Sequence, residues 1–396
     1  MQDNEKKPAL RFKGFTDPWE QRKISELAEK TYGGGTPTTS NEAFWNGNIP
    51  WIQSSDIVDG KLIGVEPRKY ITQTGLNSSA TQLVPKNSIA IITRVGVGKL
   101  AYMPFSYSTS QDFLSLSKLN TEPFFTVYAC YKKLQSELNT VQGTSIKGIT
   151  KDELLAKTIS VPVYSEQKQI GSFFAQLDTL ITLHQRKYEK LVNIKKSMLD
   201  KMFPPNGASV PEIRFKGFTD PWEQRKLGEL FEESDERASD REILSVSVAN
   251  GIYPASESDR ETNPGASLAN YKIVHFGDVV YNSMRMWQGA VDASRYDGIV
   301  SPAYVVARPN SEVYARFFAR LLRQPMLLKQ YQQVSQGNSK DTQVLKFDDF
   351  ASIGISMPAS ENEQRRIGGF FDRLDSLITL HQRKRLSIRQ RSPVWS

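Results

Sequence analysis

The sequence predicts an α+β fold that is built twice in tandem, with a long helix closing each copy. RFKGFTDPWEQRK occurs twice without a difference, at residues 11–23 and 214–226. A second pair, EQKQIGSFFAQLDTLITLHQRK at 166–187 and EQRRIGGFFDRLDSLITLHQRK at 363–384, agrees at 16 of 22 positions. Repeated segments at a nearly constant spacing indicate a unit of roughly 200 residues that is present twice.

Length and charge limit the class of protein. A chain of 396 residues suits two to three domains, each with its own core. Its 51 basic and 43 acidic residues give a net charge of +8. This balance favours a polyanionic partner, most often a nucleic acid, although a basic soluble enzyme fits the charge equally well.

The chain carries no feature of a membrane or exported protein. No apolar run approaches the ~20 residues that span a bilayer. The first residues, MQDNEKKPAL, lack the apolar core of a signal peptide. Cys130 is the one cysteine and cannot form an internal disulfide. We therefore expect a cytoplasmic protein with no membrane partner.

The interior of the first copy mixes loop, strand and helix patterns. TYGGGTPTTS, residues 31–40, is too rich in Gly, Thr and Pro for a helix and predicts a loop. Short apolar stretches at 49–52 and 88–92 predict strands, and 124–138 has helical spacing. Residues 31–160 are therefore expected to be α+β.

From residue 166 the pattern becomes that of one long helix. Its apolar seam follows alternating steps of three and four: Phe174, Leu177, Ile181, His184, Tyr188, Leu191, Lys195 and Met198. At about 1.5 Å per residue this helix would be roughly 55 Å long, and its apolar face calls for a second helix. The second copy offers one, with Phe371, Leu374 and Ile378 at the matching positions.

The repeats also predict the domain boundaries. We expect a first domain at 1–165, a spacer helix at 166–203, a linker with the second domain at 204–362, and a second spacer helix at 363–396. After Lys384 the second copy departs into RLSIRQRSPVWS, where apolar periodicity is lost and Pro393 cannot continue a helix. We expect a second helix two to three turns shorter than the first, from a frameshifted or recombined end.

Both interiors share one weaker pattern, an apolar strand followed by R-x-x-x-G, a serine and an aromatic residue. A strand leading to an arginine and a glycine turn would place Arg94 and Arg285 at hairpin tips. There an arginine can bind phosphate or the O6 and N7 of guanine, or pair with a local carboxylate. The neighbouring side chains differ between copies: Thr93, Val97, Lys99 and Tyr102 against Asn282, Ser283, Trp287 and Gln288.

Two similar DNA-binding units in one chain imitate a dimer, whose symmetry matches that of duplex DNA. Unequal side chains at equivalent tips predict unequal half-sites. The sequence therefore favours a split, asymmetric DNA target.

Recognisable active-site motifs are missing. GVGKL, residues 96–100, lacks the first glycine and the Ser or Thr of a phosphate-binding loop. Pro204 and Pro205 follow a phenylalanine and not the Asn or Asp of an amino-methyltransferase. One cysteine and three histidines do not form a zinc motif, and His184 and His381 lie on the helix seam. We expect no catalytic residue and no metal site.

Several motifs in order give the chain a family resemblance. They are DPWEQRK in each half, GGGTP and WNGNIPW in the first, GIVSPAYVV in the second, and the twice-present EQxxIGxFFxxLDxLI. The chain resembles the DNA-specificity (S) subunit of type I restriction-modification systems over nearly its whole length.

The resemblance implies two α+β target-recognition domains, separated by long helices that pair as an antiparallel coiled coil. It implies a non-catalytic subunit that binds double-stranded DNA and assembles with two methylation subunits and with restriction/translocase subunits. S-adenosylmethionine, ATP and magnesium would belong to those partners, with no cofactor bound by this chain.

Carried over by position, the resemblance also implies site residues. The DNA-binding residues would be Thr36, Trp45, Gln53, Arg94, Lys99, Asn282, Arg285, Trp287 and Gln288. Helix pairing and partner docking would use Phe174, Leu177, Ile181, Phe371, Leu374 and Ile378.

Two other functions remain open at this point. One is a self-contained DNA-cleaving enzyme, which purified chain nicking plasmid with magnesium would support. The other is a two-headed DNA-binding scaffold or repressor that works without restriction partners.

Overall fold

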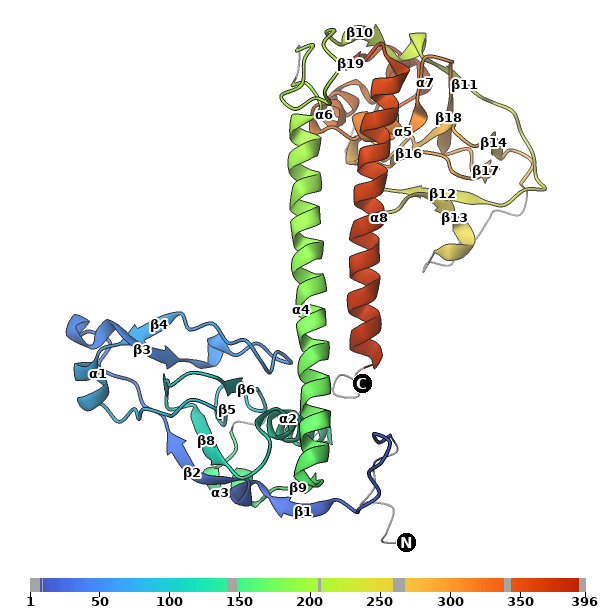
Figure 1. Cartoon of the computed structure of the whole chain (residues 1–396). Coiled ribbons are helices and arrows are strands. Elements are labelled where there is room, and N and C mark those ends of the chain that lie inside the picture. The colour runs from blue at the N-terminus through green and yellow to red at the C-terminus, as the bar shows by residue number, and fades with distance from the viewer. Residues whose placement is uncertain are drawn as a thin grey trace. The chain divides into compact units, whose positions relative to one another are not determined.

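A computed structural model of the chain describes Pro8 and residues 10–140, 148–205, 208–258, 268–337 and 343–391. The chain divides into two compact units, which are coloured along the chain in Figure 1. Unit 1 comprises Met1–Arg186 with Gln382–Ser396, and unit 2 comprises Lys187–His381. Each unit is described by itself.

Unit 1 is built on a four-stranded antiparallel sheet. Its order is β2 (Ala28–Gly33), β8 (Phe113–Leu119), β5 (Ser88–Ile92) and β6 (Leu100–Met103). Helix α2 (Pro123–Thr140) covers one face, where Phe125 and Leu134 pack with Ile89 and Ile91. The other elements are β3 (Trp45–Ile52), β4 (Lys69–Ile71), β7 (Ser108–Thr109), α1 (Gln73–Asn77) and α3 (Lys151–Ala156).

Unit 2 repeats this sheet in the same order. The strands are β11 (Phe231–Glu233), β18 (Tyr304–Pro309), β15 (Val279–Asn282) and β16 (Val291–Ala293). Around it lie β12 (Leu244–Ser247), β13 (Gly251–Pro254), β14 (Lys272–Val274), β17 (Gly298–Val300), α5 (Ala315–Leu321), α6 (Pro325–Val334) and α7 (Phe347–Ala351). Two two-stranded sheets, β12–β13 and β14–β17, and several short helices thus stand where unit 1 has its three-stranded second sheet and the long helix α2.

The duplicated segments form equivalent contacts in both units, which we call the frame. β1 (Glu20–Lys23) pairs with β9 (Thr158–Val161), and β10 (Glu223–Lys226) pairs with β19 (Gly354–Met357). Arg11 donates two hydrogen bonds of 2.7 Å to the buried Glu166 carboxylate. Arg214 does the same to the buried Glu363 carboxylate at 2.6 and 2.7 Å. RFKGFTDPWEQRK therefore fixes the start of each long helix.

The long helices are α4 (Tyr164–Lys201) and α8 (Glu361–Arg391). Within unit 2, Lys195 of α4 binds Asp375 of α8 at 2.5 Å, and Ile194 and Met198 pack against the core that holds Phe371. Within unit 1, Arg385 of α8 donates to Gln185 of α4. No helix in the described part of the chain is long and apolar enough to cross a membrane.

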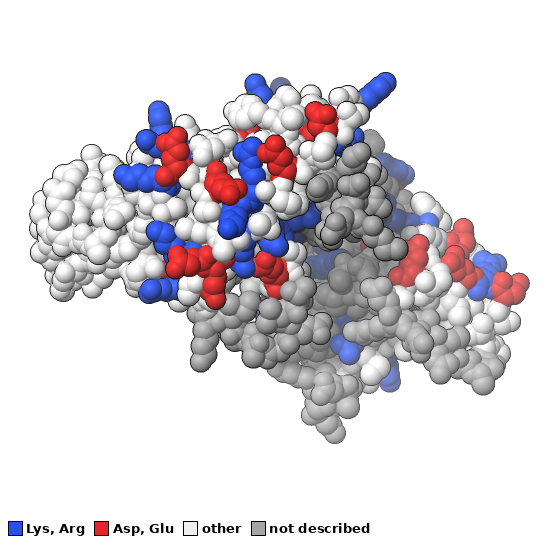
Figure 2. Space-filling model, turned by 90° about the horizontal axis from the view of Figure 1, so that it is seen from below, with Lys and Arg blue, Asp and Glu red and all other residues white. Residues whose placement is uncertain are grey.

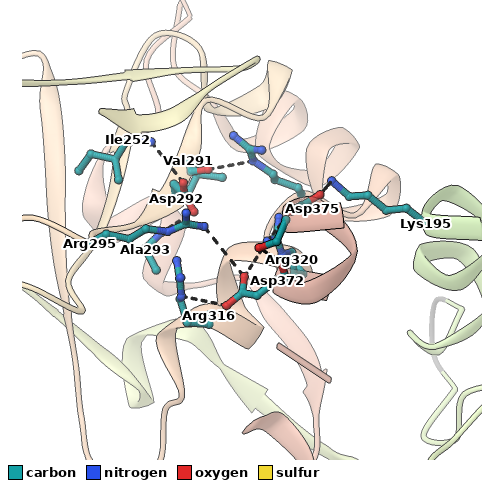
Figure 3. Close-up of polar contacts among 12 residues, drawn as sticks. Lys195, Ile252, Val291, Asp292, Ala293, Arg295, Arg316, Arg320, Asp372 and Asp375 are labelled. Atoms are coloured by element: carbon teal, nitrogen blue, oxygen red, sulfur yellow. Dashed lines mark hydrogen bonds and ion pairs between the residues drawn. The ribbon is translucent and has the colours of Figure 1, made fainter. Parts of the chain in front are cut away.

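A polar cluster joins α8 to α5 inside unit 2 (Figure 3). Asp372 accepts from Arg316 at 3.2 Å and from Arg320 at 3.0 Å. Asp375 binds Arg320 at 2.7 Å as well as Lys195. Arg320 thus links two carboxylates of the long helix α8 to helix α5 of the same unit.

Most predicted elements are confirmed. The expected strands at 49–52 and 88–92 lie in β3 and β5, and the expected helix at 124–138 lies in α2. The prediction of a loop over 31–40 was wrong at its start. Residues 31–33 extend β2, because the strand pairs with β8 as far as Gly33 opposite Leu114. Of the predicted irregular end after Lys384, residues 385–391 continue helix α8, and residues 392–396 lie outside the described residues.

Candidate nucleic-acid interface

The two predicted arginines occupy equivalent hairpin connections. Arg94 lies between β5 and β6, Arg285 lies between β15 and β16, and both strand pairs are antiparallel. Both arginines are exposed. Gly98 and Gly289 have φ of +91° and +92°, a left-handed conformation that favours glycine. The predicted hairpin geometry is therefore confirmed in both units, together with the reason for the glycine in R-x-x-x-G.

In unit 1, neighbouring loops meet beside Arg94 at one end of the sheet. The hydroxyl of Thr36 donates to Gln111 Oε1 at 2.6 Å. The backbone N–H of Thr93 donates to Asp112 O at 2.7 Å, which joins the Arg94 hairpin to the same 110–112 loop. These bonds bring Thr36 and Arg94 to a common edge.

Gln53 and Lys99 lie at this edge too. Ser110 N donates to Ile52 O at 2.9 Å, so the residue that follows β3, Gln53, adjoins the 110–112 loop. Lys99 is half-buried in the Arg94 turn, where its side chain passes Gly96. Gln111 and Asp112, which sequence reasoning missed, belong to the same group and could be located only once β8 was placed beside β5.

Trp45 has a supporting position. Its indole N–H donates to Thr38 O at 3.2 Å, and its ring meets Trp51 edge to face at 5.2 Å. The indole of Trp51 donates in turn to Gly35 O at 3.0 Å. The two tryptophans therefore hold the 34–40 loop, and the single donor of Trp45 is already used.

In unit 2, the predicted residues shape one compact turn. The guanidinium of Arg285 donates to Gln288 Oε1 at 3.2 Å. Asn282 Oδ1 accepts from Met284 N at 3.0 Å, and the half-buried Trp287 donates to Met284 O at 3.2 Å. Asn282 and Trp287 thus fix the turn, while Arg285 presents the free edge of its guanidinium.

A segment distant in sequence also reaches this turn. Leu345 N donates to Ser283 O at 2.8 Å, and Ser283 N donates to Ala303 O at 3.1 Å. The connections before β18 and before α7 therefore adjoin the Arg285 hairpin. No periodicity in the sequence marks this proximity, because it depends on the order of strands in the sheet.

Charge on the surface is mixed. On the face drawn in Figure 2, Lys and Arg side chains are interleaved with Asp and Glu. A denser basic group lines a hollow of about 690 Å³ in unit 2, formed by Lys216, Arg365, Arg366 and Arg373 with neighbouring residues. Sequence reasoning missed this group, since its members come from both duplicated segments.

Comparison with known proteins settles the family. The family described as "Type I restriction modification DNA specificity domain" matches residues 16–193 and again residues 219–390. The chain belongs to this family. The two matched specificity domains coincide with the two copies of the repeat.

Individual relatives agree with this assignment. The chain is 26% identical over 248 residues to the "Type I restriction enzyme MjaIX specificity subunit" of Methanocaldococcus jannaschii, which covers 57% of this chain and 54% of the relative. It is 30% identical over 199 residues to the "Type I restriction enzyme EcoR124I/EcoR124II specificity subunit" of Escherichia coli, covering 46% and 48%. These matches span about half the length of the curated relatives.

The fold matches a solved structure along most of its length. The S subunit of a type I restriction-modification system from M. genitalium superposes with a TM-score of 0.60 at 15% identity, covering 96% of this chain and 95% of the other. This likeness establishes the fold of two tandem α+β domains.

The predicted helix-pairing and docking residues differ in their burial. Phe371 and Leu374 are buried in the unit 2 core, against which Ile194 and Met198 of α4 also pack. Phe174 is half-buried beside the unit 1 core. Leu177, Ile181 and Ile378 are half-buried. Exposed apolar surface lies instead on Leu180, Leu183, Leu377 and Leu380, each 43–44% exposed and at matching positions of the two copies.

Among the described residues, no three His, Cys, Asp or Glu side chains gather as they would around a metal ion. Cys130 is fully buried, and burial raises the pKa of its thiol to about 12.

Proposed function

We propose that this chain is the sequence-specific DNA-recognition subunit of a type I restriction-modification complex, and that it reads a bipartite, asymmetric site. One observation carries the proposal. The same sheet order and the same arginine hairpin occur twice, with different side chains around the two arginines. Equal scaffolds with unequal tips are what two different half-sites require.

In this proposal each unit reads one half-site. The unit 1 surface consists of Thr36, Gln53, Arg94 and Lys99, with Trp45 supporting the loop. The unit 2 surface consists of Arg285 and Gln288, with Asn282 and Trp287 shaping the turn. An exposed guanidinium can donate two hydrogen bonds to the O6 and N7 of guanine, the commonest specific contact in the major groove.

The long helices would set the distance between the half-sites by pairing as an antiparallel coiled coil. Support comes from the Lys195–Asp375 ion pair in unit 2 and from the Arg385–Gln185 hydrogen bond in unit 1. At about 1.5 Å per residue, a helix of 38 residues is roughly 57 Å long. That length can separate two half-sites by more than one DNA turn of ~34 Å. Residues 1–165 and 204–362 would be the recognition domains, with 166–203 and a shorter 363–396 as spacers.

The exposed leucines Leu180, Leu183, Leu377 and Leu380 would dock two methylation subunits. Two equivalent apolar patches suit two copies of one partner, because each patch lies at the same place in its copy of the repeat. S-adenosylmethionine, ATP and magnesium would be bound by the methylation and restriction/translocase subunits. The chain itself would be non-catalytic and act in the cytoplasm.

Co-expression with the cognate methylation subunit, followed by mapping of methylated bases, tests this proposal. The expected result is methylation within one split sequence whose two halves differ. A palindromic site, or no methylation by an assembled complex, would contradict it. Plasmid nicking by the purified chain with magnesium would favour the self-contained enzyme.

A further inference from the structure

The two units differ at one place where their sequences are nearly the same. In unit 2, Met202 and Phe203, which directly follow α4, are buried against the frame. The Phe203 ring lies 6.1 Å from Trp222, 5.5 Å from Phe317 and 6.1 Å from Phe371. Trp222 is only 2% exposed there. The end of α4 thus completes the core of unit 2.

Unit 1 has the same receptor, and no residue in the described part of the chain takes the place of Phe203 there. The counterparts of Trp222, Phe317 and Phe371 are Trp19, Phe125 and Phe174, and together they line an open groove of about 840 Å³. Phe173, also at the groove, is 43% exposed. The indole N–H of Trp19 has no hydrogen-bond partner among the described residues, whereas that of Trp222 donates to Glu363 at 3.4 Å.

The correspondence of the two receptors rests on contacts as well as sequence. Gln167 accepts from Glu122 N in unit 1, and its counterpart Gln364 accepts from Tyr314 N in unit 2. Glu122 and Tyr314 are therefore equivalent positions in the two units, and so are Phe125 and Phe317, each three residues further along the chain. Gln21 and Gln224 bond equivalent serines, Ser160 and Ser356, on the strand beside each receptor. The groove is therefore the same binding surface, and none of the residues that the structure describes occupies it as Phe203 occupies its counterpart.

Charge extends the match beyond the apolar residues. In unit 2, Lys195 lies in α4 seven residues before Met202 and forms an ion pair with Asp375. The counterpart of Asp375 in unit 1 is Asp178, which accepts a 2.6 Å hydrogen bond from Tyr128, a residue that lines the groove. A helix that docked in unit 1 as α4 docks in unit 2 would therefore bring the lysine at the Lys195 position next to the Asp178 carboxylate.

We propose that the unit 1 groove is a docking site for the end of a spacer-type helix supplied by another polypeptide, with the Lys-x6-Met-Phe pattern of residues 195–203. The chain's own example of this segment is buried in unit 2 and tethered there. The proposal does not depend on DNA recognition.

A peptide of residues 188–205, labelled at its N-terminus, is the probe. Fluorescence anisotropy with the full-length chain should show saturable binding of one peptide per chain. A Phe203→Ala peptide should bind about tenfold to hundredfold more weakly, since it loses a buried aromatic ring. A Lys195→Glu peptide should also bind more weakly, and the Asp178→Lys chain should recover part of that loss.

Variants of the chain assign the site. Ala129→Trp places a large side chain in the groove and should abolish binding, whereas Val58→Trp on an exposed loop should leave it unchanged. Absence of saturable binding, or equal binding of the Phe203→Ala peptide, would overturn the proposal. So would unchanged binding to a folded Ala129→Trp chain, because the peptide would then lie elsewhere, including unit 2. The Phe203→Ala peptide is compared with the parent peptide on the unaltered chain, so this result tests the proposal even if a chain variant fails to fold.

Discussion

Units 1 and 2 share their frame and differ in what the frame holds. The bidentate Arg–Glu pair that anchors each long helix is the same in both, to within 0.1 Å per bond. The hairpins that carry Arg94 and Arg285 have the same strand partners but different turn chemistry. Contacts that hold the fold have stayed equal, while side chains able to face a ligand have diverged.

The two units also differ in the contacts made by one equivalent aspartate on each long helix. Asp178 and Asp375 are counterparts, yet Asp178 accepts from the Tyr128 hydroxyl and Asp375 binds Arg320 and Lys195. Burial raises the pKa of Asp178, while the Tyr128 hydrogen bond opposes that rise. The same residue is thus a desolvated carboxylate in one unit and an ion-pair partner in the other.

The largest expected effect tests the equality of the frames. Glu363→Ala leaves Arg214 without its buried partner and should lower the free energy of unfolding by about 3 kcal/mol. Glu166→Ala should destabilise the protein in the same direction through Arg11. Urea unfolding followed by circular dichroism measures both, with Glu361→Ala in the exposed first turn of α8 as control. A large loss of unfolding free energy for one variant and none for the other would show that the two Arg–Glu pairs are not equivalent.

The next effect tests whether the Arg94 and Arg285 hairpins read different half-sites. Arg94→Ala and Arg285→Ala should each weaken DNA binding by about 1–3 kcal/mol and relax specificity in one half-site only. Competition binding with duplexes altered in either half-site measures this, and Lys118→Ala at the opposite end of the unit 1 sheet serves as control. Equal weakening on all sequences would make that arginine a phosphate contact.

A smaller effect separates the two aspartates. Asp375→Asn loses ion pairs with Arg320 and Lys195 and should cost about 1 kcal/mol, whereas Asp178→Asn keeps an acceptor for Tyr128 and should cost less. Because the pKa of Asp178 is raised in the folded state, its contribution to stability grows as pH falls through that pKa and is lost as pH rises. Unfolding between pH 4 and 7 should show this gain in the parent and not in Asp178→Asn. Identical pH profiles would contradict the assignment.

The sequence predicted the features that are duplicated or that follow a regular residue spacing. The duplicated segments located the frame, and the R-x-x-x-G pattern located both hairpins because a left-handed glycine leaves a local mark. Sequence reasoning missed Gln111, Asp112 and Leu345, since their positions follow from strand order and long-range pairing. It predicted Phe371 and Leu374 for helix pairing and partner docking together, because an apolar face has the same pattern whether it packs against its own unit or another subunit. Both side chains are buried in the unit 2 core.

The central claim is that each interior reads its own half-site and that the frames are interchangeable. Replacing residues 31–157 with residues 234–353 would give a chain with two unit 2 interiors on its two frames. Methylation mapping with the cognate partner should then show two copies of the unit 2 half-site, in inverted orientation. Methylation of the original asymmetric site by this chain would contradict the account.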